Sequence, residues 1–139
     1  ESVGMAINWL NNDGITLFQN CNEIIKGYPS FNRLKIIELT KPAKNNPAYF
    51  NLIGTILLLI IYRMVLLTSF MEKTEPTQTE IDFLSIIPLN KDTPFILADL
   101  YSNVANSLNT CEDLNLDLQN ELINNFILLE KTLLESGYD

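Results

Sequence analysis

The chain has 139 residues, of which 47% are hydrophobic and 19% are charged, a composition that predicts one folded domain and excludes a disordered segment. Its net charge of −8 argues against nucleic-acid binding by the domain as a whole, because such binding depends on neutralising phosphate charge. The sequence contains no histidine, so His-dependent catalytic triads, His general bases and His-containing zinc sites are excluded within this chain.

The two cysteines offer little chemistry. Cys21 and Cys111 lie far apart in the sequence, have no neighbouring base that would activate a nucleophile, and are too few for a four-cysteine zinc site. We expect reduced, buried thiols in an intracellular protein of the nucleus or cytoplasm, with a single disulfide as the alternative. Neither a G-x-x-x-x-G-K-[ST] motif nor a G-x-G-x-x-G motif occurs. The sequence therefore predicts no cofactor, no metal ion and no enzymatic activity.

The start of the chain carries no sign of a secretory signal peptide. It begins at Glu1, and no basic stretch there precedes a short apolar segment. We expect residues 1–139 to form a single helical domain that is a fragment of a longer protein.

Helix boundaries are marked by prolines, a glycine and capping residues. Asn46 and Thr93 each stand immediately before a proline, as expected of a capping side chain followed by the first helical residue. Thr77 is followed three residues later by Glu, the spacing of a capping box, and Thr110 is followed three residues later by Asp. Gly27 and several prolines mark helix ends. These marks predict seven helices, at 3–11, 15–26, 31–40, 47–73, 79–87, 94–108 and 112–135.

The run NLIGTILLLIIYRMVLLTSF, residues 51–70, is the most apolar part of the chain and has Arg63 as its single charge. A helix that is apolar on nearly every side must be enclosed by other helices or by lipid. Arg63 near the middle of a membrane span would cost about 2.5–3.5 kcal/mol on insertion scales. We therefore expect the helix at 47–73 to be the largely buried centre of the domain, with a membrane span as the alternative. In the buried case, Arg63 either reaches solvent or pairs with an acidic residue of the C-terminal half.

The last two predicted helices are amphipathic. In the helix at 94–108, the residues expected to face inward are Ile96, Leu97, Leu100, Val104 and Leu108. In the helix at 112–135, the apolar stripe consists of Leu114, Leu118, Leu122, Phe126, Leu129 and Leu133. Each stripe needs an apolar partner, which the central helix can supply.

Charge is distributed unevenly along the chain. Residues 1–71 contain six basic and four acidic side chains, a balance of +2, whereas residues 72–139 contain three basic and thirteen acidic ones, a balance of −10. The basic residues of the first half include a cluster between positions 26 and 44, namely Lys26, Arg33, Lys35, Lys41 and Lys44. This cluster is either a set of solvated helix faces or a small basic patch.

The candidate binding site is an acidic group made of Glu112, Asp113, Asp117 and Glu121. In the predicted last helix, Glu112 and Asp113 occupy the first turn, where they would complement the helix dipole, and the other two form a solvated face. The pattern does not fit a calcium loop, because the sixth position is Leu118 instead of Gly. Carboxylates at helical spacing also suit the docking of a basic segment from a partner protein.

Taken together, these features predict an all-α, single globular bundle of about six to seven helices around a long, largely buried central helix at 47–73. The function we expect is a non-catalytic protein–protein interaction or scaffolding domain of a larger intracellular regulatory protein. One alternative is an apolar groove or cavity that binds an amphipathic peptide helix or a small apolar ligand. Another is a membrane-associated protein that uses residues 51–70. An enzyme based on the carboxylates of Glu80 and Asp82 would lack a supporting third residue.

Overall fold

The computed structural model describes residues 12–69, 74–114 and 116–136. The helix predicted at 3–11 and the last residues of the predicted central helix, 70–73, lie outside the described residues. Within them the chain is helical and contains no β-strand, which confirms the all-α prediction. In chain order the elements are α2 (Asn12–Ile25), α3 (Arg33–Thr40), the 3₁₀ helix η1 (Lys41–Asn45), α4 (Pro47–Thr68), α5 (Gln78–Leu84), α6 (Thr93–Asp113) and α7 (Leu118–Ser136).

Two of the predicted helix starts are capped as expected. Pro47 is the first residue of α4, and the side-chain oxygen of Asn46 accepts a hydrogen bond from the backbone N–H of Tyr49 at 3.1 Å. At the start of α5, the Thr77 hydroxyl accepts from the Glu80 N–H at 3.2 Å, and the Glu80 carboxylate accepts from the Thr77 N–H at 2.8 Å. This reciprocal pair is the predicted capping box.

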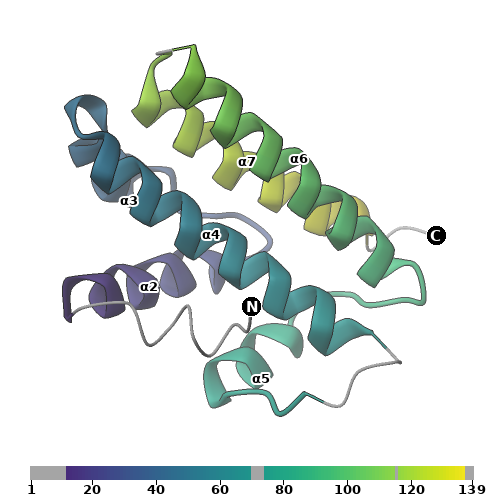
Figure 1. Cartoon of the computed structure of the whole chain (residues 1–139). Coiled ribbons are helices and arrows are strands. Elements are labelled where there is room, and N and C mark those ends of the chain that lie inside the picture. The colour runs from purple at the N-terminus through teal and green to yellow at the C-terminus, as the bar shows by residue number, and fades with distance from the viewer. Residues whose placement is uncertain (1–11, 70–73, 115, 137–139) are drawn as a thin grey trace.

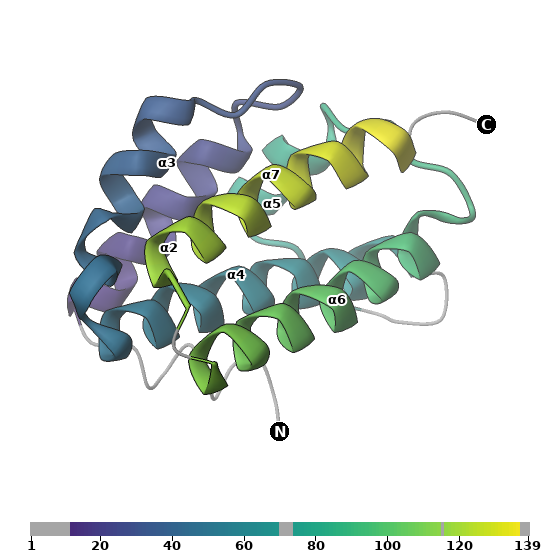
Figure 2. The same ribbon diagram turned by 90° about the horizontal axis from the view of Figure 1, so that it is seen from above.

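The long helix α4 is the centre around which the others are arranged. It packs against α6, α2, η1 and α7. The helices α6 and α7 form an antiparallel pair along one side of α4, and α2 and α5 lie on its other side (Figure 1). A second view shows that α3 lies next to both α2 and α7 (Figure 2). The helix α3 therefore connects the two groups of helices that lie on either side of α4.

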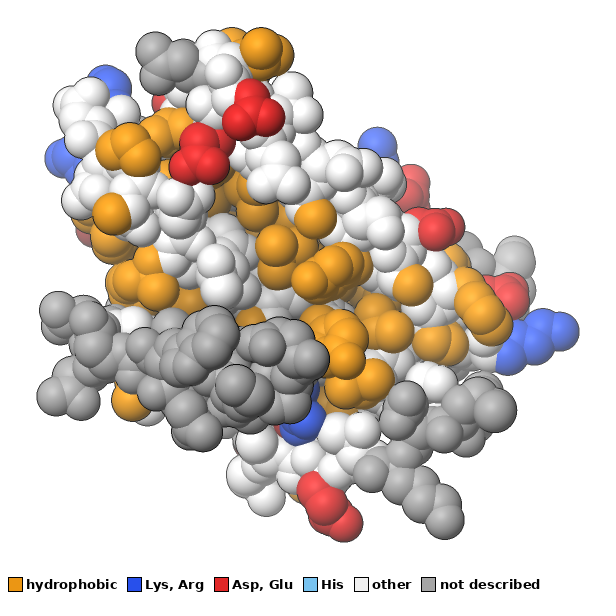
Figure 3. All heavy atoms as spheres, in the orientation of Figure 1, with side chains coloured by type: hydrophobic (Ala, Val, Ile, Leu, Met, Phe, Trp, Pro, Cys, Tyr) orange, Lys and Arg blue, Asp and Glu red, His pale blue; other side chains and the backbone are white. Residues whose placement is uncertain are grey.

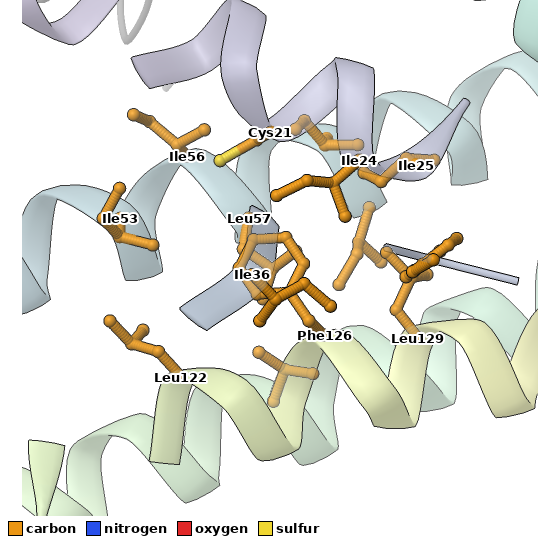
Figure 4. Close-up of a cluster of buried hydrophobic side chains, with 14 of the residues drawn as sticks. Cys21, Ile24, Ile25, Ile36, Ile53, Ile56, Leu57, Leu122, Phe126 and Leu129 are labelled. Carbon is orange, nitrogen blue, oxygen red and sulfur yellow. The ribbon is translucent and has the colours of Figure 1, made fainter. Parts of the chain in front are cut away.

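The core consists mainly of aliphatic and aromatic side chains, and every helix of the described residues, α5 and η1 included, contributes to it. Figure 4 shows side chains from α2, α4 and α7 converging around Phe126, which is fully buried. The buried residues of α4 are Phe50, Ile53, Gly54, Ile56, Leu57, Leu59, Ile60, Ile61 and Met64. The predicted core role of this helix is therefore confirmed.

Among the described residues, α4 alone is long and apolar enough to cross a membrane by length and composition, with a mean hydropathy of 2.2. The core helix of a globular protein meets the same two criteria. The contacts of α4 with its neighbouring helices favour the core interpretation. Arg63 does not stand alone in the apolar run, because it pairs with Glu80 of α5 at 2.6 Å. Of the two alternatives expected for Arg63, the structure shows the pairing with an acidic residue of the C-terminal half.

The predicted boundary between the last two helices is wrong. The helix α6 does not end at residue 108 but continues to Asp113, and α7 begins at Leu118 instead of at residue 112. The side chain of Asp117 accepts from the backbone N–H of Asn120 at 3.0 Å and so caps α7, a role that the sequence analysis gave to Thr110. The predicted cap at Thr93 is also wrong, since the structure places this residue inside α6.

Most residues of the two predicted apolar stripes, in α6 and α7, are buried. In α6 the buried members are Leu97, Leu100, Val104 and Leu108, and Ile96 is half-buried. In α7 they are Leu118, Leu122, Phe126, Leu129 and Leu133. Leu114 is the exception, because it lies in the turn between the two helices and is exposed.

Both cysteines are free thiols, and both are buried. The disulfide alternative is therefore wrong, and the prediction of buried thiols is confirmed. Burial raises the pKa of the Cys21 thiol to about 12.

Candidate functional site

The four acidic residues of the predicted site come from two helices and the turn between them. Glu112 and Asp113 are the last two residues of α6, Asp117 is the cap of α7, and Glu121 lies in the first turn of α7. The prediction that all four share one helix is therefore wrong. We refer to these four residues as the acidic end of the molecule.

A tight turn brings the members of the acidic end together. The N–H of Leu116 donates to the carbonyl of Cys111 at 3.1 Å, and the N–H of Leu114 donates to that of Thr110 at 3.0 Å. The Cys111 thiol lies 3.9 Å from the carbonyl oxygen of Asp117. The turn thus folds the start of α7 back onto the last turn of α6.

The electrostatics of Cys111 reflect this arrangement. Burial raises the pKa of the Cys111 thiol, and the negative charges of Glu121, Asp117 and Glu112 raise it further. The charges of three acidic side chains, from α6, the turn and α7, therefore act on one thiol. Asp113 is adjacent to Glu112 in the chain and completes the acidic end.

The carboxylates of the acidic end form no ion pair within the part of the chain that the structure describes. Its ion pairs are Glu23–Lys26, Arg33–Glu130 and Arg63–Glu80, and none involves the acidic end. Glu112 and Asp113 also stand at the C-terminus of α6, where unpaired carbonyl groups add negative potential. The predicted favourable interaction of these two acids with a helix dipole is therefore reversed.

Polar contacts hold three of the four carboxylates in place, and one of them is the hydrogen bond that Asp117 accepts from the Asn120 N–H. Glu112 accepts from the side-chain amide of Asn51 in α4 at 2.9 Å. Glu121 lies 3.4 Å from the side-chain amide of Asn125, one turn further along α7. These neutral contacts orient the carboxylates without removing their charge.

Two leucines in the turn give the acidic end an apolar component. Leu114 is 63% exposed and Leu116 is 51% exposed. This feature was not predicted from the sequence, because the helical period places Leu114 on the inward stripe. The signal that could have found it is the cap spacing of Asp117 and Asn120, which marks a helix start after Leu116.

The predicted basic cluster is divided by the fold. Arg33 forms a two-point ion pair with Glu130 of α7, with distances of 2.7 and 2.9 Å, and Lys26 pairs with Glu23 at 3.4 Å. The three remaining members, Lys35, Lys41 and Lys44, are exposed. Only part of the cluster is therefore available to a partner.

A second candidate site is an apolar groove between α2, α4 and α5 with a volume of about 650 Å³. Its apolar lining includes Phe18 of α2, Met64 of α4 and Phe83 of α5. Charged rim residues also line it, and these form the ion pairs Glu23–Lys26 and Arg63–Glu80. The groove therefore suits an apolar ligand, because each charged side chain that lines it is already part of an ion pair.

Both carboxylates considered for catalysis have hydrogen-bond partners within the chain. Glu80 is occupied by Arg63 and by the backbone of Thr77, and Asp82 accepts from the side chain of Gln78 at 2.9 Å. Within residues 12–69, 74–114 and 116–136, no group of three or more His, Cys, Asp or Glu residues could hold a metal ion.

No protein-family model, curated protein or solved structure matches this chain. The functional assignment therefore depends on the geometry of the two candidate sites.

Proposed function

We propose that this chain is a non-catalytic interaction or scaffolding domain of an intracellular regulatory protein, and that its acidic end docks a basic segment of a protein partner. The observation that carries the proposal is the exposure of Leu114 and Leu116 among four carboxylates that have no ion-pair partner among the described residues. Exposed apolar side chains next to charged and polar side chains are typical of a protein-binding surface.

The two components of this surface have different roles. An exposed ion pair contributes only about 0–1 kcal/mol, whereas full burial of a leucine side chain contributes about 1.5–3 kcal/mol. The affinity for a partner therefore comes mainly from Leu114 and Leu116, and the carboxylates supply orientation and a faster association rate. A matching partner segment carries Lys or Arg next to apolar residues.

The test compares capture of basic proteins from lysate by immobilised wild type and by the variant Glu112→Lys/Asp113→Lys. The variant is expected to fold, because lysines at the C-terminus of α6 complement the helix dipole. We expect its capture of basic partners to fall by at least about tenfold. Unchanged capture would refute docking at the acidic end.

A matched control variant is Asp99→Lys/Glu135→Lys. It makes the same change in net charge at exposed positions of α6 and α7 outside the acidic end. We expect it to capture partners as the wild type does. A loss in this control equal to that in Glu112→Lys/Asp113→Lys would assign the effect to net charge and not to the acidic end.

The groove between α2, α4 and α5 supports a second candidate function, binding of an amphipathic peptide helix or a small apolar ligand. Its volume and apolar lining are typical of such sites. An apolar fluorescent probe should bind to the wild type with defined stoichiometry and be displaced by an amphipathic helical peptide. The substitution Ile15→Lys inside the groove should abolish binding. The control Ile86→Lys, at a similarly exposed residue that does not line the groove, should leave it unchanged.

A further inference from the structure

The helix α7, whose start carries Asp117 and Glu121 of the acidic end, packs against η1, which carries two lysines. Gln119, in the first turn of α7, donates from its side-chain amide to the carbonyl of Ile37 at 3.3 Å and lies 3.5 Å from the Thr40 hydroxyl. These contacts hold the end of α3, and with it η1, against the start of α7. Lys41 and Lys44 of η1 are exposed and form no ion pair with any residue that the structure describes. We refer to Lys41 and Lys44 as the basic edge.

Exposed apolar side chains accompany both charged groups. Leu34 and Ile37 of α3 are 65% and 46% exposed and precede the basic edge in the chain, just as Leu114 and Leu116 adjoin the acidic end. Figure 3 shows acidic, basic and hydrophobic side chains together at the upper left end of the molecule, over η1, the start of α4 and the turn between α6 and α7. One end of the molecule thus carries both signs of charge and an unburied apolar component.

A surface of this kind is complementary to itself. We infer that it binds a second copy of the chain across a two-fold axis, so that the basic edge of each copy lies on the acidic end of the other. This inference rests on the proposed function, because it names the basic edge of a second copy as the basic segment that the acidic end docks.

In a two-fold dimer, every contact between the acidic end of one copy and the basic edge of the other occurs twice. Both copies contribute an acidic end and a basic edge, and the exposed leucines and isoleucine of each copy are covered by the other. The groove between α2, α4 and α5 has no such property, because its charged rim residues are already paired within one copy. The net charge of −8 opposes association, so we expect a weak dimer whose formation depends on local charge complementarity.

A charge-swap experiment on the 139-residue chain tests this inference by sedimentation velocity over a range of protein concentrations. One variant, Glu112→Lys/Asp113→Lys, makes the acidic end basic, and the other, Lys41→Glu/Lys44→Glu, makes the basic edge acidic. We expect the dissociation constant of each variant alone to rise at least about tenfold. An equimolar mixture of the two should form a heterodimer, because each variant then presents the charge that the other has lost.

The control variant Asp99→Lys/Glu135→Lys should dimerise as the wild type does. Circular dichroism checks that each variant is folded, and the single substitutions Asp113→Lys and Lys44→Glu replace any double variant that loses helix content. A wild type that stays monomeric at every concentration, or a mixture that does not associate, would overturn the inference.

The outcomes separate this inference from the proposed function. A monomeric wild type that still loses its lysate partners on Glu112→Lys/Asp113→Lys would overturn the dimer and leave the proposed docking function in place. Charge-swap rescue together with lysate capture that the substitution does not affect would support the dimer and exclude a separate basic partner at the acidic end.

Discussion

Arg63 of α4 and Glu80 of α5 form a two-point ion pair, with Nη2–Oε1 and Nε–Oε2 distances of 2.6 and 2.8 Å. The same carboxylate accepts the backbone N–H of Thr77 at 2.8 Å, and Arg63 donates to the carbonyl of Glu75 at 3.0 Å. A single carboxylate therefore caps α5 and fastens it to the central helix. The one charge in the apolar run serves to attach a neighbouring helix.

Replacing Glu80 by Gln should destabilise the fold. The substitution removes the partner of a largely buried guanidinium and weakens the capping box, so we expect the free energy of unfolding to fall by about 1–3 kcal/mol. Urea denaturation monitored by circular dichroism measures the change. The control Asp82→Asn alters a nearby carboxylate whose hydrogen bond is exposed, and it should change stability by less than about 0.5 kcal/mol. Equal effects of the two substitutions would contradict this role of Glu80.

Stability should decline in acid because two glutamates are held in their charged form. Burial alone would raise the pKa of Glu80, but hydrogen bonds from Arg63 and Thr77 and the charge of Arg63 outweigh it, so this pKa is lowered. The hydrogen bond from Arg33 lowers the pKa of Glu130; burial opposes this shift, and the Phe31 N–H and the Arg33 charge add to it. Both groups therefore stabilise the fold above the ordinary carboxyl pKa of about 4.3.

This contribution is lost as the pH falls from about 4.3 through the lowered pKa values of the folded state. Thermal unfolding between neutral and acid pH should show a steep decrease in the melting temperature over that interval. The variant Glu130→Gln should have a lower melting temperature at neutral pH and a shallower decrease in acid. A variant whose profile runs parallel to that of the wild type would show that Glu130 titrates normally.

The close approach of α4 and α6 should require a small residue at position 54. A Cβ atom added to Gly54 would lie 3.0 Å from a terminal methyl carbon of Leu108. We expect Gly54→Val to lower the free energy of unfolding by about 1–3 kcal/mol through overpacking, and by less in a Leu108→Ala background. Thr55→Val, at the exposed neighbouring position, is the control and should cost less than about 0.5 kcal/mol. A tolerated Gly54→Val would indicate that the two helices can move apart freely.

The two thiols should be unreactive in the folded protein. Both are buried, the pKa of Cys21 is raised to about 12, and that of Cys111 is raised by burial and by the surrounding acidic residues. Because the thiolate is the reactive form, a disulfide reagent at neutral pH should label neither cysteine until denaturant is added. Rapid labelling of one thiol under native conditions would mean that its part of the core opens readily.

Local signals in the sequence were sufficient to predict most of the fold. Asn46 before Pro47 and the spacing of Thr77 and Glu80 predict the starts of α4 and α5, and both caps are present. The apolar run after Pro47 predicts the central helix, since a helix apolar on most sides has to be enclosed. Periodicity likewise predicts the buried stripes of α6 and α7.

The turn between α6 and α7 could not be predicted in this way. Neither Gly nor Pro occurs between Asp113 and Leu118, and Leu114 continues the helical period of the residues that follow it. Thr110 has the spacing of a capping box with Asp113, whereas the structure places the cap at Asp117. The helical period therefore places the four acidic residues on one helix, whereas the structure divides them between α6, the turn and α7.

Ion pairs between residues that are far apart in the sequence also cannot be predicted from local patterns. Nothing local to Arg33 or to Glu130 indicates that they pair, because 97 positions separate them. The groove between α2, α4 and α5 has the same origin, since its walls come from three separate parts of the chain.

In the structure, α4 is enclosed by the helices of its own chain. Amide hydrogen exchange, measured by mass spectrometry on protein purified without detergent, tests this claim. We expect α4 to contain the slowest-exchanging amides of the molecule, because its hydrogen bonds should open only when the whole domain unfolds. Fast exchange along α4 in detergent-free buffer, or protection that appears only in micelles, would contradict the claim.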